Sequence, residues 1–154
     1  MVSYWTIRLL CWAALLLTPA TPREEIAREV HQRVNAYRTA QRKSTLAARN
    51  VLHSLALEHS EGMASGRIPF SHQGFEGRAR CARKALPGTG LIAENVYMTM
   101  TPGSSRIAAE AVAAWISSPG HQKNMVGDFV YTGIGVAQGA DGSWYVTQLF
   151  AGKM

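Results

Sequence analysis

Apolar residues recur every three or four positions from residue 22 to about residue 39, which is the period of an amphipathic helix. Thr21 and Glu24 are three positions apart and flank Pro22, so they form a capping-box pattern at the start of this helix. Arg38 falls outside the apolar stripe and is expected to face solvent. The stripe consists of Ile26, Val30, Val34 and Tyr37.

A second helix is predicted to begin with Asn50 as its N-cap and to end at Gly66. His59 lies on its apolar face, and we interpret it as a hydrogen-bonded core residue, the usual role of a lone histidine in that setting. Residues 67–90 show no sustained period and contain proline and glycine. They are predicted to form a long loop with a turn of helix around residues 78–85.

The C-terminal half predicts two more helices and three strands. Ser104 or Ser105 can cap a third helix, and Pro119 begins a short fourth helix that contains His121. A buried strand is predicted over residues 91–98. Two further segments, residues 132–136 and residues 144–150, alternate in polarity around an Asp-Gly turn and are typical of a β-hairpin. Helices are therefore expected to flank a mainly antiparallel sheet.

The N-terminal residues have the pattern of a signal peptide. Arg8 precedes an apolar run over residues 9–17, and small residues follow at 18–20. The run is shorter than the roughly 20 apolar residues that a membrane-spanning helix needs. We predict a signal peptide over residues 1–20 and one domain over residues 21–154, secreted or periplasmic, with no membrane span after cleavage.

The cysteine content predicts a domain without an internal disulfide, and the charge indicates which partners to expect. Cleavage would remove Cys11 and leave Cys81 without a partner for an internal disulfide. The chain has a formal net charge of +6, and part of this excess gathers in residues 78–84. A basic surface favours anionic lipid headgroups or acidic cell-envelope polymers, and the alternative is a solvated basic loop. Nucleic acid is not expected as a partner, because the sequence has no nucleic-acid-binding motif.

Three polar residues, His72, Glu94 and His121, stand where predicted elements begin or end and are not explained by packing. Their separations are too wide for a local metal-binding motif. The sequence has no Gly-x-Ser-x-Gly nucleophile elbow, no His-Glu-x-x-His helix and no phosphate-binding glycine loop. The motifs of the common hydrolases are therefore missing.

Seven short segments, taken in chain order, carry a family resemblance. They are Asn35-Ala36-Tyr37-Arg38, His59-Ser60, Phe70-Ser71-His72, Ala93-Glu94-Asn95, Trp115 with Ser118-Pro119-Gly120-His121, Thr132-Gly133-Ile134-Gly135-Val136 and Thr147-Gln148-Leu149-Phe150. In this order they resemble the bacterial, SCP-like form of the CAP superfamily, which comprises cysteine-rich secretory proteins, antigen 5 and pathogenesis-related proteins. The resemblance covers residues 24–150.

The resemblance implies an α+β fold, a three-layer α/β/α sandwich with a mainly antiparallel central sheet. It also implies a cleft in which two histidines and two acidic residues meet, of which His72, Glu94 and His121 match three. The fourth, a glutamate shortly after the tryptophan of the third helix in eukaryotic members, has no counterpart after Trp115. Glu76 is a candidate to replace it, and the alternative is a solvated loop residue.

His72, Glu94 and His121 have two alternative roles, a chemical one and a structural one. Two imidazoles and a carboxylate could bind a divalent metal such as zinc, with His72 and His121 as ligands, or could relay protons near neutral pH. In the structural alternative, Glu94 and His121 satisfy each other and nearby backbone groups.

Three functions follow as hypotheses. CAP domains are associated with sterol, lipid, metal or protein binding, so the resemblance favours a non-enzymatic module that binds a lipid, a sterol-like ligand or an anionic envelope component. The second hypothesis is a metal-dependent hydrolase or peptidase built on His72, Glu94 and His121. The third is a secreted, envelope-directed antimicrobial effector that uses the basic surface.

Overall fold

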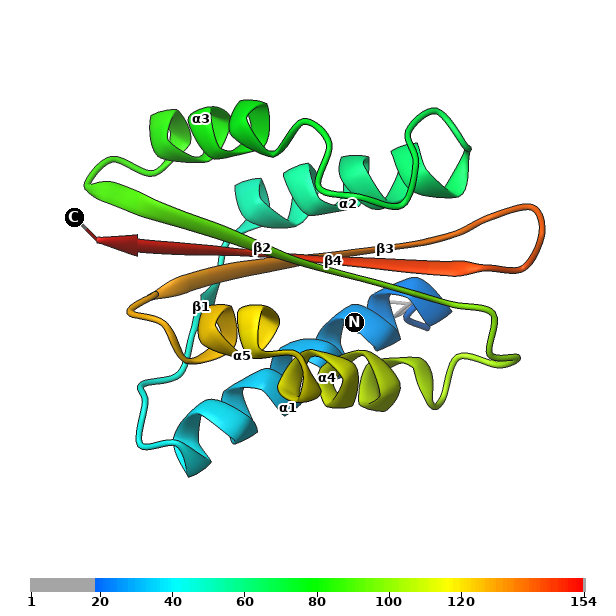
Figure 1. Ribbon diagram of the computed structural model, residues 1–154, viewed down its shortest axis with the longest axis horizontal. Helices are drawn as coiled ribbons and strands as arrows, with labels where there is room; N and C mark the ends of the chain where they lie inside the picture. Colours follow the sequence, from blue (N-terminus) through cyan, green and yellow to red (C-terminus); the bar gives the residue numbers. More distant parts are fainter. Residues whose placement is uncertain (1–18, 154) are drawn as a thin grey trace, which may run out of the picture.

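The computed structural model describes residues 19–153, so nearly all of the predicted signal peptide, including Cys11, lies outside the described residues. A four-stranded sheet separates two helical layers (Figure 1). α2 and α3 cover one face of the sheet, and α1, α4 and α5 cover the other. In chain order the elements are α1 (Pro22–Ala40), β1 (Ala47–Ala48), α2 (Asn50–Ala64), α3 (Phe75–Ala85), β2 (Thr89–Thr99), α4 (Ile107–Ser117), α5 (Pro119–Val126), β3 (Tyr131–Gln138) and β4 (Trp144–Lys153).

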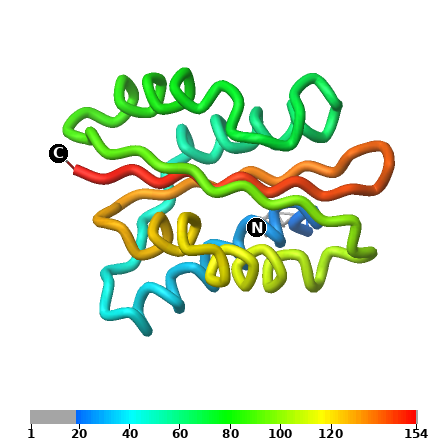
Figure 2. Tube along the Cα trace, viewed as in Figure 1, coloured from blue at the N-terminus to red at the C-terminus, as the bar shows by residue number. Residues whose placement is uncertain are grey.

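The strand order is β1-β3-β4-β2, and the sheet is mixed. The two-residue β1 runs parallel to β3, whereas β4 pairs antiparallel with both β3 and β2. Figure 2 shows the end of β4 beside the start of β2, where Lys153 pairs with Thr89. Gly142, at a φ of +87°, turns the predicted hairpin between β3 and β4. The predicted sandwich is confirmed, with β1 as its parallel strand.

Alternation along β4 sends its side chains into two separate cores. Val146 and Phe150 belong to the core on the side of α1, α4 and α5, where Trp115 is 1% exposed. Leu149 and Ala151 belong to the core beneath α2 and α3. Burial on both faces holds the two helical layers to the sheet. Between residues 19 and 153, no helix has both the length and the apolar character that would be needed to cross a bilayer.

Glycines in β3 allow α2 to lie directly on the sheet. A Cβ atom at Gly133 would overlap the α2 backbone at Leu52 and His53, and one at Gly135 would overlap it at Leu57. Only glycine permits so close an approach of two backbones. This approach sets the height of α2 above the sheet, and with it the position of every side chain that α2 contributes to the site.

Two local predictions were wrong. The segment 67–90 is not a long loop, because it contains the helix α3, of which the expected turn at 78–85 is only the second part. The caps also differ from expectation: Asn50 is the first residue of α2 after the cap residue Arg49, and α4 follows Arg106 rather than a serine cap. The capping box of α1 is confirmed, since Thr21 and Glu24 bond reciprocally.

The expectation that Arg38 faces solvent was also wrong, since this residue is 2% exposed. Its guanidinium donates hydrogen bonds to the backbone carbonyls of Ser44 (2.7 Å), Met125 (2.8 Å), Gly127 (3.0 Å) and Phe129 (3.2 Å). Three of these carbonyls lie at the end of α5 and just beyond it. Arg38 therefore anchors α5, the helix that carries His121.

β2 is an edge strand, and helix side chains protect it. Three of its carbonyl groups accept side-chain hydrogen bonds, which leaves fewer groups free to pair with a strand of another chain. The pairs are Arg83 to Gly90 (2.9 Å), Asn124 to Glu94 (3.2 Å) and Trp115 to Val96 (3.0 Å). One donor comes from the α2–α3 layer and two from the other, so both layers converge on this edge.

Candidate functional site

Glu94 lies near the middle of β2, and its side chain is 1% exposed. Its Oε1 accepts hydrogen bonds from His72 Nδ1 at 2.9 Å and from Arg78 Nη2 at 2.8 Å. Its Oε2 accepts from Arg78 Nε at 2.7 Å. The buried carboxylate is therefore held by a two-point guanidinium contact and one imidazole, which together offset its loss of water.

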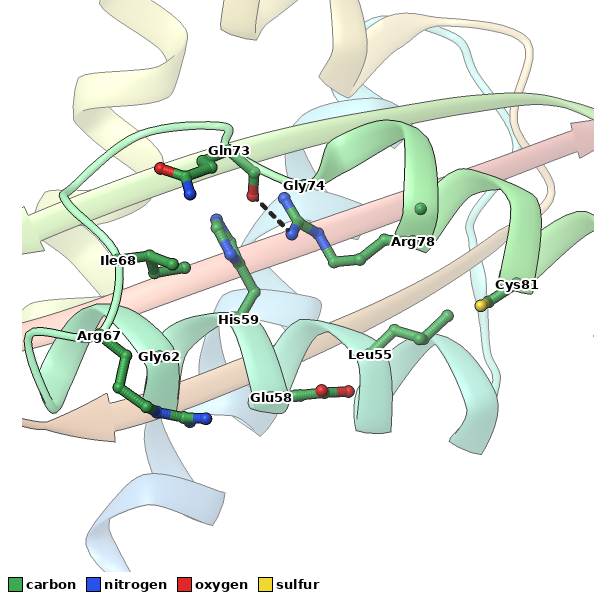
Figure 3. Close-up of a pocket in the computed structure, with 11 residues that line it drawn as sticks. Leu55, Glu58, His59, Gly62, Arg67, Ile68, Gln73, Gly74, Arg78 and Cys81 are labelled. Atoms are coloured by element: carbon green, nitrogen blue, oxygen red, sulfur yellow. Dashed lines mark hydrogen bonds between the residues drawn. The ribbon is translucent and has the colours of Figure 1, made fainter.

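α3 and the loop before it position these two partners. Gly74 adopts a φ of +81° immediately before α3, where its lack of a side chain allows the turn from the loop into the helix. Arg78, one turn into the helix, reaches back over this turn and donates from Nη1 to the Gln73 carbonyl at 2.9 Å (Figure 3). Three hydrogen bonds, from Nε, Nη1 and Nη2, thus hold the guanidinium, and only 12% of the Arg78 side chain is exposed.

His121 approaches from the opposite helical layer, on α5. The ring centroids of His72 and His121 are 6.3 Å apart, and the rings are inclined by 44°. Burial is the main cause that lowers the pKa of His121, and the neighbouring His72 lowers it further. Both effects favour the neutral form of the His121 imidazole. Asn95 donates to the His121 carbonyl at 3.1 Å and ties this helix to β2.

A cavity of about 300 Å³ opens in front of Glu94. Its wall combines apolar and polar side chains, which suits a ligand that has both characters. Because His72 Nδ1 donates to Glu94, the Nε2 edge of the ring faces away from this carboxylate, and the side chain is 49% exposed. The lining residues are His72, Phe75, Ile92, Ala93, Glu94 and Asn124.

His59 lies behind the carboxylate, in a second cavity of about 360 Å³ between α2 and α3 (Figure 3). Its Nε2 donates to the Ser71 carbonyl at 2.9 Å and lies 3.8 Å from Glu94 Oε1. Burial lowers the pKa of His59, although the Glu94 carboxylate opposes this effect. His59 is thus a buried, hydrogen-bonded residue that supports the loop carrying His72, in agreement with its interpretation from the sequence.

The structure bonds His72 to the Glu94 carboxylate and places its ring beside that of His121, which is not among the residues that line the cavity in front of Glu94. Glu94 does not bond to His121 as the structural alternative expected, because its carboxylate is held by His72 and Arg78. Glu76 is exposed and is not among the residues that line the cavity in front of Glu94. Sequence reasoning missed Arg78, although one signal was present: it lies four residues before the buried Ala82, on the inner face of α3.

The donor atoms do not fit a three-ligand metal site. Within residues 19–153, no group of three or more His, Cys, Asp or Glu side chains is arranged to hold a metal ion. Both oxygens of Glu94 are committed to Arg78, so the carboxylate is not an open ligand. Only the imidazoles of His72 and His121 remain, one fewer than the three protein ligands that catalytic zinc sites use.

The family model described as "CAP: Cysteine-rich secretory protein family" matches residues 31–150. No curated protein sequence matches the chain. Among solved structures, an outer surface protein from Borrelia burgdorferi is similar, with a TM-score of 0.69, 18% identity and coverage of 85% of this chain and 95% of that one.

An extracellular protein containing an SCP domain, from Bacillus anthracis, has a TM-score of 0.68 and 25% identity, with coverage of 88% of this chain and 45% of that one. A cysteine-rich secretory protein from Staphylococcus aureus has a TM-score of 0.67 and 14% identity, with coverage of 88% of this chain and 41% of that one. This chain therefore spans less than half the length of the last two proteins.

Proposed function

Because this chain belongs to the cysteine-rich secretory protein (CAP) family, we propose that it is a secreted, non-enzymatic binding module whose ligand or partner enters the cavity in front of Glu94, beside His72 and His121. The observation that carries the proposal is the meeting of these two imidazoles, from opposite helical layers, in front of a buried carboxylate that is already neutralised. A carboxylate held by Arg78 is poorly suited to act as a general base, because its charge is already paired.

The ligand that fits this cleft has an apolar part and a hydrogen-bonding part. Phe75 and Ile92 offer apolar contact, while His72 and Asn124 offer polar atoms within the same cavity. A lipid, a sterol-like molecule or an anionic component of the cell envelope has this combination. Arg80, Arg83 and Lys84, which are exposed on nearby α3, would favour the anionic choices.

Metal-dependent hydrolysis is the weaker candidate. The contact from Glu94 to His72 Nδ1 resembles the carboxylate–histidine arrangement that orients metal-ligating histidines. That arrangement favours weak binding of a divalent metal by His72 and His121, and it supplies no third protein ligand. Binding without catalysis is therefore the function that this donor set supports.

Secretion is part of the proposal. The predicted leader precedes the capping box at Thr21, and two of the similar structures come from an outer surface protein and an extracellular protein. Mass spectrometry of the protein exported from a bacterial host should find a new N-terminus near Thr21. Recovery of the uncleaved chain in the inner membrane would contradict this localisation.

The binding function is tested with purified domain and four probes: a fluorescent fatty acid, a fluorescent cholesterol analogue, phosphatidylglycerol vesicles and purified bacterial cell-wall polymer. We expect at least one probe to bind, and its affinity to fall about tenfold or more in His72→Ala/His121→Ala. The control is His53→Ala, an exposed histidine outside the cleft. Failure of every probe to bind, or equal binding by the double variant, would overturn the proposal.

A further inference from the structure

We propose that the cavity in front of Glu94 binds a short, extended peptide segment, which pairs with the backbone of β2 at Ile92 as an added strand. The inference rests on the proposed function, because it names a ligand class for the same cavity. Such pairing requires an edge strand with free backbone groups. β2 is an edge strand in the order β1-β3-β4-β2, so the structure meets the first requirement.

The hydrogen bonds of the sheet indicate which residues of β2 face this edge. Successive residues of a paired strand direct their backbone groups to opposite sides. On β3, the Thr132 carbonyl accepts from the backbone beside β1, so the next residue, Gly133, bonds to β4 at Leu149. Leu149 is thereby committed to β3, and its partner on β2, Glu94, directs its backbone groups to the open edge. Ile92, two residues earlier, faces the same way.

The open edge of β2 is capped on both sides of Ile92 but not at Ile92 itself. Arg83 donates to the Gly90 carbonyl at 2.9 Å, and Asn124 donates to the Glu94 carbonyl at 3.2 Å. Within residues 19–153, no side chain donates to the Ile92 carbonyl, and no acceptor meets the outward amides of Ile92 and Glu94. The Ile92 carbonyl is therefore an open acceptor between two open donors.

This row of backbone groups is complementary to a peptide. An extended peptide presents amide and carbonyl groups at the spacing of a β-strand, and it can bond to all three open groups. A hydrocarbon chain or a sterol ring can fill a cavity, but it has no matching row of donors and acceptors. From Gly90 to Glu94 the strand spans about 13 Å, at about 3.3 Å per residue, so the paired segment is about four residues long.

The cavity lies where this peptide would run. It has a volume of about 300 Å³, its wall includes Ile92 and Glu94, and Phe75 from α3 and Asn124 from α5 also line it. In Figure 1, β2 is the strand in front, and it passes between α3 above and α5 below. Directly opposite residues of paired strands share a face, and Ile92 belongs to the core beneath α2 and α3. The peptide residue opposite Ile92 would therefore direct its side chain toward Phe75.

A phage-displayed library of random seven-residue peptides, selected on the purified domain, supplies the probe. The strongest binder is synthesised, together with forms that each carry one backbone N-methyl group and so lack one N–H. We expect N-methylation to weaken binding at least tenfold at alternate positions, because only alternate amides of a paired peptide face β2.

Amide hydrogen exchange, measured by NMR, locates the paired strand on the protein. In the complex with the unmethylated peptide, exchange should slow at least tenfold at Ile92 and Glu94, whose amides become hydrogen-bonded. Ala93 and Asn95 are the internal controls, because their amides already bond to β4 and should change less.

A matched pair of variants tests the cavity. Phe75→Ala should weaken binding of the same peptide about fivefold or more, because it removes the ring against which a peptide side chain packs. Phe70→Ala removes a ring that is 48% exposed and does not line the cavity, so it should bind as the wild type does. Circular dichroism establishes that both variants are folded. If Phe75→Ala does not fold, the methylated peptides and the exchange rates decide, since both use the wild type.

The inference is overturned if no peptide is selected, if no N-methyl group weakens binding, or if exchange at Ile92 and Glu94 does not slow. The proposed function survives that result if a lipid or polymer probe binds and depends on His72 and His121. A peptide that meets every expectation but binds equally well to His72→Ala/His121→Ala would support the added strand and contradict the role of the two imidazoles. The two proposals can therefore fail separately.

Discussion

The Arg38 guanidinium on α1 donates a hydrogen bond of 2.8 Å to the Met125 carbonyl at the end of α5, although the two residues are 87 positions apart in the sequence. This buried contact is one of three that join Arg38 to the end of α5 and the residues just beyond it. Through it, the orientation of His121 depends on a residue that lies far from the cleft.

Arg38→Met should therefore lower the free energy of unfolding by about 3 kcal/mol, because it leaves buried carbonyls without donors. Urea unfolding followed by circular dichroism measures this change. Arg33→Met on the same helix is the control: Arg33 is 46% exposed in its pair with Glu29, so its loss should cost less than about 1 kcal/mol. A similar cost for both variants would show that the buried bonds at Arg38 contribute little.

Gly135→Ala should destabilise the domain by at least about 3 kcal/mol, because the new Cβ would overlap the α2 backbone at Leu57. Gly77→Ala is the matched comparison, since a Cβ there meets nothing within 4 Å and alanine favours the helix α3. It should stabilise by about 0.5 to 1 kcal/mol. Thermal melts of the two variants should shift in opposite directions, and a shift of the same sign would contradict the close approach of α2 to β3.

Stability should fall as the pH drops below about 6.5, in part because of His59. Burial lowers the pKa of His59 from its ordinary value of 6.5. As the pH falls below 6.5, His59 is therefore protonated in the unfolded chain before it is protonated in the folded chain, and this favours unfolding. The contribution of neutral His59 to the free energy of unfolding is therefore complete above pH 6.5. It is lost as the pH falls toward the lower pKa of the folded state. The charged or titratable groups that face it are Glu94, Arg78 and His72.

Urea unfolding at pH 7.5, 6.5 and 5.5 checks this effect. His59→Gln should depend less on pH than the wild type over this range, because the residue that titrates has been removed. His121 has a pKa lowered by burial as well, so part of the dependence should remain in the variant. Identical pH dependence in the two proteins would show that His59 is not kept neutral by the fold.

Cys81→Ser should leave stability almost unchanged, because Cys81 is exposed and is not part of a disulfide within the described chain. The melting temperature should stay within about 2 °C of the wild type in both reducing and oxidising buffer. Non-reducing electrophoresis provides the accompanying control for bridges between chains. A large loss of stability that appears only in oxidising buffer would indicate such a bridge.

Features that depend on neighbours in the sequence were predictable. The capping box of Thr21 and Glu24 forms within one turn of helix, and the Asp-Gly turn between β3 and β4 is equally local. The alternation along β4 predicted a strand because its period follows from backbone geometry alone. The approximate positions of α1, α2 and α4 were visible in the same way, since each buries one periodic face, and α5 was predicted from the start signal at Pro119.

The sequence pattern did not predict most of the helix α3. Its fully buried positions are two alanines, Ala79 and Ala82, and basic residues surround them. Because the buried side chains are small and most of the others are charged, the segment has too few large apolar residues to show a sustained apolar period. The helix is stabilised by packing against α2 and β2. The residues of these two elements lie elsewhere in the chain, so the pattern within residues 75–85 does not reveal them.

The sequence by itself determined most of the elements, though not α3 or β1, and, through the order of its motifs, the family. Only the tertiary structure decided what its charged residues do. Arginine is usually a surface residue, but Arg38 and Arg78 are each held by groups elsewhere in the chain. Arg38 is held by carbonyls around α5, and Arg78 by the Glu94 carboxylate. A buried charge is tolerated only where its partners meet it in space, and the pairing of residues on different layers of the sandwich arises when the chain folds.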